Sequence, residues 1–350
     1  FSHWNFQGSM MRKAILWLCA CLFCEGVVVR MVGDMMLGRG VNQRLVEQPD
    51  YNIWGTTLSV LKEADLLLGN LESTISCACT LTAYKCQPWP GKMYHVAFEK
   101  WIVNSSLKAV PFHHVNLANN HILDFGLEGL RQSLETLAIN NISWAGAGID
   151  LQSSIRPAVK EVKGIRFHIF GASEQEREWA AGLPYVKELR QVKGEEGTWV
   201  FDLSKPEVLV NTMEHYRRKI GEHDVIILYL HWGENWERTL PKEKKDLARA
   251  LLLHAGVNVI VGTSPHHIQP WERIGNGVVF YSIGDFVNDY PRRAEWRNDL
   301  AVIPSINFHT SGSIKEVQFI PVVIKKHQVN LWKQGDPADE EFFRWKGIPV

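Results

Sequence analysis

Side chains able to bind a metal or move a proton follow several short apolar runs in this sequence. Asp34, Glu72, Asn120, His121, His231 and His266 occupy five such run ends. Imidazole nitrogen combined with carboxylate and amide oxygen suits Mn, Fe or Zn, whereas an all-oxygen site suits Mg or Ca. Such an ion polarises a phosphoryl or acyl oxygen and activates water near neutral pH. The pattern therefore predicts a site that holds one or two divalent metal ions.

Each of these residues also has a purely structural explanation. Asp34 could cap a turn, Glu72 could cap a helix, and His231 could be a hydrogen-bonded core histidine. For a single histidine the structural explanation holds in most proteins. The recurrence of such groups at one kind of position favours a functional site.

The elements that must position these groups are strands followed by loops or helices. Apolar runs predict strands at 27–32, 66–68, 115–117, 165–170, 225–230, 257–261 and 278–283, and alternation over 302–324 predicts antiparallel strands. Leucines at three- and four-residue steps predict a helix after Asp124 that stops at Asn140. A second helix has Pro241 in its first turn, and Gly256 suits its C-cap. Polar groups at strand ends are aimed out of the sheet edge, where α/β proteins build their sites.

This order of elements predicts an α/β fold with a β-rich second half. We expect one domain over residues 25–350, in which the charged segment 174–197 is a variable insertion or a lid. The polar segment that contains Pro88 and Pro90 is expected to form a loop over the site.

Charge and aromatic content limit the partners. The chain has 350 residues, with 38 Lys and Arg against 38 Asp and Glu, so no net charge favours a nucleic acid or an anionic membrane surface. Its 14 tryptophans are typical of core and pocket lining, and aromatic faces also suit sugars or flexible polymer chains.

The N-terminal 24 residues differ in character from the rest. Residues 6–10 resemble a protease-cleavage scar, and residues 1–10 are left out of the fold prediction. Basic residues at 12–13 followed by an apolar run to 23 resemble a secretory signal, which predicts a secreted or extracellular membrane-associated protein. The alternative is a buried leading strand in a cytosolic protein. In an exported protein, Cys86 could pair with Cys77 or Cys79.

Several blocks together resemble the CapA/PgsA family of poly-γ-glutamate capsule proteins. They are GDMMLGR at 33–39, GNLE at 69–72, LANNHILDFG at 117–126, HWGE at 231–234, PHHIQ at 265–269 and YSIGDF at 281–286. They occur in the family's order and cover most of the chain. The resemblance implies a calcineurin-like metallophosphoesterase fold, a four-layer sandwich of two mixed sheets flanked by helices.

The resemblance also implies roles for individual residues. Asp34, Asn120, His231 and His266 match metal ligands of that superfamily, and His121 matches a general acid. The sequence departs from the usual dinuclear pattern at Met36, Asn70, Thr263, Ser264 and Asp285. The lost imidazoles and the lost anionic bridge favour one metal, or an altered pair that uses Glu72.

Three functional hypotheses follow. The first is a protein that makes, exports or processes a γ-linked glutamate polymer, in contact with an anionic polymer and a membrane-associated synthesis complex. The second is a metal-dependent phosphoesterase that hydrolyses a phosphate ester. The third is a non-catalytic polymer-binding or assembly subunit. In the catalytic versions Asp124 orients His121, unless it caps the following helix, and Arg39 contacts an anionic substrate.

Overall fold

The computed structural model describes residues 26–76, 88–174 and 196–350. The expected signal segment, the six cysteines and nearly all of the expected 174–197 insertion therefore lie outside the described residues. Within the described ranges, no helix combines the length and the apolar character that a membrane crossing requires.

The first large sheet has the strand order β18-β17-β16-β1-β2-β5-β6, with β15 paired to β1. Its strands are β1 (Val27–Met35), β2 (Leu66–Asn70), β5 (His114–Asn116), β6 (Ser143–Ala145), β15 (Asp285–Val287), β16 (Leu300–Phe308), β17 (Ile314–Lys325) and β18 (Gln328–Leu331). Strands β15, β1, β2, β5 and β6 run parallel to one another, and β16 joins β1 antiparallel. The alternating second half thus forms the antiparallel part of this sheet, as predicted.

The second large sheet has the order β13-β14-β12-β11-β9-β8. Its strands are β8 (Ala158–Val162), β9 (Ile165–Ser173), β11 (Val225–His231), β12 (Val259–Thr263), β13 (Trp271–Ile274) and β14 (Gly277–Phe280). Strands β9, β11, β12 and β14 are parallel. Every residue of β11 is buried, as expected of a continuous apolar run in a parallel strand covered on both faces.

The two sheets pack face to face. Alternate residues of their strands point to opposite faces, one set into the cluster between the sheets and the other into a cluster on the outer side. Leu66 and Leu68 of β2 pack with Ile227 and Tyr229 of β11 in one cluster between the sheets. Leu67 of β2 enters a second cluster on the outer side of the first sheet, and Leu228 of β11 enters a third on the outer side of the second. Burial of each such side chain stabilises the fold by roughly 1.5–3 kcal/mol.

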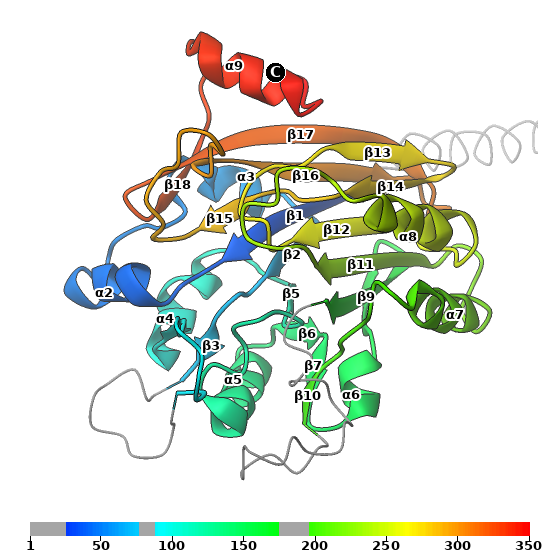
Figure 1. The fold of residues 1–350 in the computed structure, drawn as a ribbon, viewed down its shortest axis with the longest axis horizontal. Helices are drawn as coiled ribbons and strands as arrows, with labels where there is room; N and C mark the ends of the chain where they lie inside the picture. Colours follow the sequence, from blue (N-terminus) through cyan, green and yellow to red (C-terminus); the bar gives the residue numbers. More distant parts are fainter. Residues whose placement is uncertain (1–25, 77–87, 175–195) are drawn as a thin grey trace, which may run out of the picture.

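Helices cover both outer sides, which completes the predicted four-layer sandwich (Figure 1). The helices are α2 (Arg39–Glu47), α3 (Leu58–Lys62), α4 (Lys100–Ser105), α5 (Gly126–Ile139), α6 (Leu151–Ile155), α7 (Pro206–Arg217), α8 (Lys242–Leu253) and α9 (Pro337–Trp345), with 3-10 turns at Gly55–Thr57 and Leu107–Ala109. Short pairs β3 (Thr74–Ile75) with β4 (Ala97–Phe98), and β7 (Ala147–Gly148) with β10 (Gly197–Thr198), complete the elements. In Figure 1, α7 and α8 lie beside β11 and β12, and α9 lies above β17.

Most predicted elements are confirmed, with shifted ends. Helix α5 ends where the leucine pattern stops, and its C-cap is Asn140. Gly256 is not a C-cap, because His254 caps α8; Gly256 lies two residues further on, with a φ of 70°. Pro241 is the N-cap residue of α8 and lies just before the helix, not inside its first turn. Strand β14 stops at Phe280, before the predicted end at 283, and the chain turns further on at Gly284, where φ is 78°.

Two glycines allow backbone segments to approach closely beside the strand ends. A Cβ atom on Gly33 would lie 1.8 Å from the carbonyl oxygen of Gly284, and one on Gly262 would lie 1.9 Å from that of Tyr281. A side chain at Gly33 would push apart the segments that carry Asp34 and Asp285, and one at Gly262 would push β12 away from Tyr281. The spacing of the site thus depends on glycine here.

Candidate metal centre

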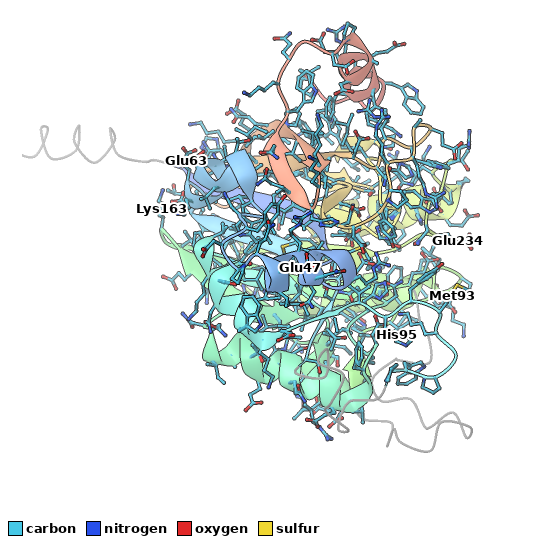
Figure 2. The ribbon with its side chains drawn as sticks, turned by 90° about the vertical axis from the view of Figure 1, so that its left-hand side faces the viewer. Glu47, Glu63, Met93, His95, Lys163 and Glu234 are labelled. Atoms are coloured by element: carbon cyan, nitrogen blue, oxygen red, sulfur yellow. The ribbon has the colours of Figure 1, made fainter. Side chains whose placement is uncertain are left out.

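The carboxyl ends of the parallel strands of both sheets meet at one end of the molecule. Asp34, Asn70 and Asn116 occupy one row across β1, β2 and β5, and His231 pairs in register with Thr263. Figure 2 shows Glu234, which follows β11, on one side of the molecule with Met93 and His95, and Glu63, which precedes β2, on the other. The predicted convergence of strand-end side chains is therefore present.

Glu72 forms the centre of the first group of candidate ligands. Ligand atoms of Asp34, Glu72 and His231 all lie within 4.8 Å of one another, and all three side chains are buried. Glu72 Oε1 lies 3.7 Å from His231 Nε2 and 3.8 Å from His121 Nε2. Neither carboxylate oxygen of Glu72 has a hydrogen-bond partner among the described residues. Burying a carboxylate without hydrogen bonds lowers the stability of the fold unless a nearby cation compensates its charge.

A second group shares Asp34 and adds His266 and Asp285. His266 Nδ1 lies 2.8 Å from Asp285 Oδ1 and 3.6 Å from Asp34 Oδ2. Burial lowers the pKa of His266, but Asp285, Glu72 and Asp34 outweigh this and raise that pKa to about 10. In the protein alone, the imidazolium of His266 thus compensates part of the acidic cluster.

The remaining carboxylates stay poorly compensated. Burial, together with Asp285, raises the pKa of Asp34 to about 6 against the opposing effects of His266 and of the hydrogen bonds from Asn70 and Ser264. Burial and the neighbouring Asp34 raise the pKa of Glu72 well above its usual value. Burial lowers the pKa of His231 well below its usual range, so this imidazole is neutral, as a metal ligand must be. The cluster has the acidic potential that favours a bound cation.

Neighbouring polar groups hold the candidate ligands in place. Asn70 Nδ2 donates to Asp34 Oδ1 at 2.6 Å, and the backbone N–H of Ser264 donates to Asp34 Oδ2 at 3.1 Å. His231 Nδ1 lies 3.0 Å from Thr263 Oγ1. Asn70, Thr263 and Ser264, three of the residues that depart from the usual dinuclear pattern, thus orient the candidate ligands and leave His231 Nε2 directed at the site.

Asn120 and His121 both reach the same place. Asn120 Oδ1 lies 3.1 Å from His231 Nε2, whereas the preceding Asn119 turns away to donate to the Leu71 carbonyl at 2.9 Å. His121 Nδ1 lies 2.6 Å from Asp124 Oδ2. Burial lowers the pKa of His121 to about 4, against the opposing effect of Asp124.

Asp124 is not the N-cap residue of α5, because that residue is Phe125 and no side chain caps the helix. Its carboxylate instead contacts His121, the backbone N–H of Val96 at 2.5 Å and Lys92 Nζ at 2.8 Å. Lys92 also donates to the Asn120 carbonyl oxygen. The segment after Pro88 therefore packs on the site, as expected for a loop over it.

Arg39 lies outside the ligand groups. It forms an ion pair with Asp289 and lies 5.0 Å from the ring centroid of Tyr290. The Tyr290 ring in turn lies 5.0 Å from that of His266. Arg39 is therefore connected to the site through Tyr290, and no described contact places it on a candidate ligand.

The loop after β12 has an unusual backbone. Ser264 and His266 have positive φ values of 97° and 60°. Such conformations cost of order 1–3 kcal/mol for a non-glycine residue and persist where the surroundings enforce them. In this loop the two conformations place both the Ser264 N–H and the His266 ring beside the Asp34 carboxylate.

Asp285 was not predicted as a ligand, although the structure places it among them. A sequence signal was present: Gly284-Asp285 follows an apolar run as Gly33-Asp34 does. Strand β15 pairs with β1 so that Asp285 lies beside Asp34. Lys92 was also missed, and its segment offers no pattern that points to it.

Comparisons with known proteins find relatives named for capsule and polyglutamine synthesis. CapA, a capsule biosynthesis protein of Bacillus anthracis, is 27% identical over 266 residues, which cover 76% of this chain and 60% of that protein. A probable polyglutamine synthesis accessory protein of Mycobacterium tuberculosis is 29% identical over 349 residues, covering 89% of this chain and 88% of that protein. The crystal structure of a 5'-nucleotidase precursor from Thermus thermophilus aligns with a TM-score of 0.41 and 13% identity, over 87% of this chain and 54% of that one. This TM-score is too low to carry an argument.

The family comparison covers the strand ends described above. Residues 28–290 match the family described as bacterial capsule synthesis protein PGA_cap. That range is most of the chain and includes Asp34, Glu72, His231, His266 and Asp285. The chain therefore belongs to the bacterial capsule synthesis protein family PGA_cap.

Proposed function

We propose that this protein takes part in the synthesis, export or processing of a γ-linked glutamate polymer, through a strand-end site that binds a divalent metal ion. Capsule and polyglutamine synthesis in the names of the relatives support the pathway. The signal-like residues 11–23 support export towards a membrane-associated complex. The observation that carries the metal site is Glu72, a fully buried carboxylate without a hydrogen-bond partner among the described residues.

The donor set fits a divalent transition metal. Glu72, Asp34, His231 and the Asn120 amide offer mixed oxygen and nitrogen ligands on one side, and Asp34, His266 and Asp285 offer a second group. Mixed N and O donors select Mn, Fe or Zn over Mg or Ca. When bound, such an ion supplies Lewis-acid polarisation of an acyl or phosphoryl oxygen. Two groups that share Asp34 suit one ion or an altered pair.

His121 is placed to move a proton at the same point. A carboxylate accepts and does not donate, so the contact with Asp124 puts the ring proton of neutral His121 on Nδ1. Nε2 then has a free lone pair and faces Glu72. Before His121 can act as a general acid, Nε2 must take up a proton, and the Asp124 carboxylate stabilises the resulting imidazolium.

A second candidate function is hydrolysis of a phosphate ester. The His121–Asp124 pair favours it, because departure of an alkoxide needs a proton donor held in a fixed orientation beside the metal ligands. The two candidates differ in substrate and share the metal centre, so one set of assays addresses both.

The test begins with metal analysis of the purified protein, followed by assays with Mn²⁺, Zn²⁺ and Fe²⁺. Substrates are a γ-linked glutamate oligomer and aryl phosphate mono- and diesters. We expect bound metal, and binding or cleavage of the oligomer that is lost in His231→Ala. Bound metal with fast aryl phosphate turnover, and no action on or binding of the oligomer, would instead establish the phosphoesterase. A correctly folded protein that takes up none of these metals would overturn both.

A further inference from the structure

A cluster of aromatic rings and arginines adjoins the second ligand group. The Trp236 ring lies 5.7 Å from that of His266 and 5.7 Å from that of Tyr290, and the Trp296 ring lies 4.9 Å from that of His267. The backbone N–H of Trp236 donates to the Pro265 carbonyl at 3.2 Å. Trp236, Tyr290 and Trp296 are half-buried, whereas His266 beneath them is only 1% exposed. Each of these three residues therefore keeps part of its surface in contact with solvent beside the candidate metal centre.

Two arginines lie on these rings. The guanidinium carbon of Arg293 lies 4.6 Å from the Trp236 ring centroid, and that of Arg238 lies 4.9 Å from the Trp296 centroid. Ring stacking holds a guanidinium group in one plane and leaves its N–H edge free for a carboxylate. The two indole rings are 6.4 Å apart, so the two cations belong to one surface. Trp236, Tyr290, Trp296, Arg238 and Arg293 together are called the Trp-Arg surface.

The cations of this surface are available to a ligand. Arg293 has no ion pair with an acidic side chain among the described residues. Arg238 pairs with Glu295 at 3.5 Å, but the two side chains are 72% and 61% exposed, so the pair is weak and exchangeable. Arg297 in the same segment differs, because Asp299 and Asp339 both bind its guanidinium group and tie it to α9. Arg297 is thus held by largely buried acidic partners, whereas Arg238 has only the exposed Glu295.

We propose that the Trp-Arg surface is a substrate-binding subsite that holds the carboxylates of an anionic polymer chain next to the metal centre. The inference rests on the proposed function and narrows its substrate class. A small phosphate ester would need only the metal centre, whereas two outward-facing guanidinium groups beyond His266 require further anionic groups on the same molecule. In a γ-linked glutamate chain, the methylene groups pack on the indole rings and the α-carboxylates meet the arginines.

The test measures binding of a labelled γ-linked glutamate oligomer at fixed ionic strength, by fluorescence anisotropy. The variant is Arg238→Ala with Arg293→Ala. Its control is Arg218→Ala with Arg249→Ala, which removes the same charge from two exposed arginines, the C-cap of α7 and a residue of α8, that also have only surface ion pairs. An amidated oligomer and polyphosphate are the comparison ligands. Melting temperature and metal content of each variant show that fold and centre are intact.

We expect the Arg238/Arg293 variant to bind the oligomer at least tenfold more weakly, and the control variant to bind within twofold of wild type. The amidated oligomer and polyphosphate should bind more weakly than the carboxylate chain. Equal losses in both variants, no loss in either, or tighter binding of polyphosphate would overturn the subsite. If wild type binds no metal but still binds the oligomer through these arginines, the proposed metal function fails and the subsite stands. If the Arg238/Arg293 variant keeps normal metal content and turnover and binds the oligomer as wild type does, the subsite fails and the proposed metal function stands.

Discussion

Glu72 and His231 face each other across the space between the two sheets, with Oε1 and Nε2 3.7 Å apart. Each is fully buried at the carboxyl end of its own sheet. The distance is too long for a hydrogen bond, and both oxygens of Glu72 lack a hydrogen-bond partner among the described residues. Two ligands from separate sheets therefore converge on one point without satisfying each other, which is the arrangement that a cation between them would stabilise.

Replacing Glu72 tests this relationship directly. In Glu72→Gln we expect metal content to fall severalfold, and the rise in melting temperature caused by added metal to disappear. Without metal, the variant should be as stable as wild type or more stable, because an uncompensated buried carboxylate has been removed. Metal analysis and thermal unfolding with and without chelator measure both effects.

The matched control is Glu63→Gln, whose carboxylate is 65% exposed at the opposite end of the molecule (Figure 2). It should keep wild-type metal content and the metal-induced stabilisation. Unchanged metal binding in Glu72→Gln would show that Glu72 is not a ligand.

Asp124→Asn addresses proton transfer. The amide keeps the shape of the side chain but no longer supports an imidazolium on His121, which Asp124 contacts at 2.6 Å. We expect metal-dependent turnover to fall by about 10²–10⁴-fold, the usual range for general acid–base catalysis, with metal content unchanged. Asp150→Asn, which changes the N-cap of α6, should leave turnover unchanged. A loss of metal in Asp124→Asn would indicate a structural role instead.

Histidines buried away from the site predict how stability depends on pH. Burial, with a smaller contribution from Lys160, lowers the pKa of His114 to about 3, and burial also lowers the pKa of His168. Between pH about 6.5 and 3, the unfolded chain therefore binds a proton at His114 that the folded chain does not. Stability from this group is complete above pH about 6.5 and falls by up to about 1.4 kcal/mol per pH unit as the pH drops through that window.

Urea unfolding of wild type and His114→Gln at pH 7, 6, 5 and 4 checks the slope. Subtracting the two curves cancels the other groups, including Asp34, whose raised pKa acts in the opposite direction. The variant should lose stability more slowly on acidification. Identical slopes would show that His114 is not responsible.

Much of the fold and most of the candidate ligands could be predicted from the sequence, because apolar runs and the small residues after them are local signals. The five predicted ligands Asp34, Glu72, Asn120, His231 and His266 lie together, although their roles stay predictions. Asp285 was not predicted as a ligand: Gly284-Asp285 follows an apolar run as Gly33-Asp34 does, but only the pairing of β15 with β1 places Asp285 beside Asp34. The role of Asp124 could not be chosen from the sequence, because an aspartate at this position can cap the following helix or hydrogen-bond a histidine. Contacts from Lys92 and Val96, distant in sequence, decide between them.

The Trp-Arg surface lies beyond sequence analysis for a related reason. Fourteen tryptophans gave no basis for choosing those beside the site. Trp236 has a φ of 65° and Arg297 a φ of 48°, so both loops adopt conformations that only their packing enforces. Stacking of Arg293 on Trp236 joins two loops that are far apart in the chain.

The loop that carries Trp236 is anchored by a buried ion pair, and this pair yields the last prediction. Lys244 of α8 is 1% exposed, and its Nζ lies 2.7 Å from Glu237 Oε2, which also accepts from Gln269 at 3.1 Å. Lys244→Met removes the cation but keeps the apolar stem on Trp232. It should destabilise the protein by about 1–3 kcal/mol, because Glu237 is left in a largely buried place. Adding Glu237→Gln should recover most of that loss, which a double-mutant cycle in urea would show as a coupling of about 0.5–3 kcal/mol.

The pair Lys242–Asp246 on the same helix, with side chains 81% and 57% exposed, should show almost no coupling. Additive effects of the Lys244 and Glu237 substitutions would mean that the pair does not hold the loop.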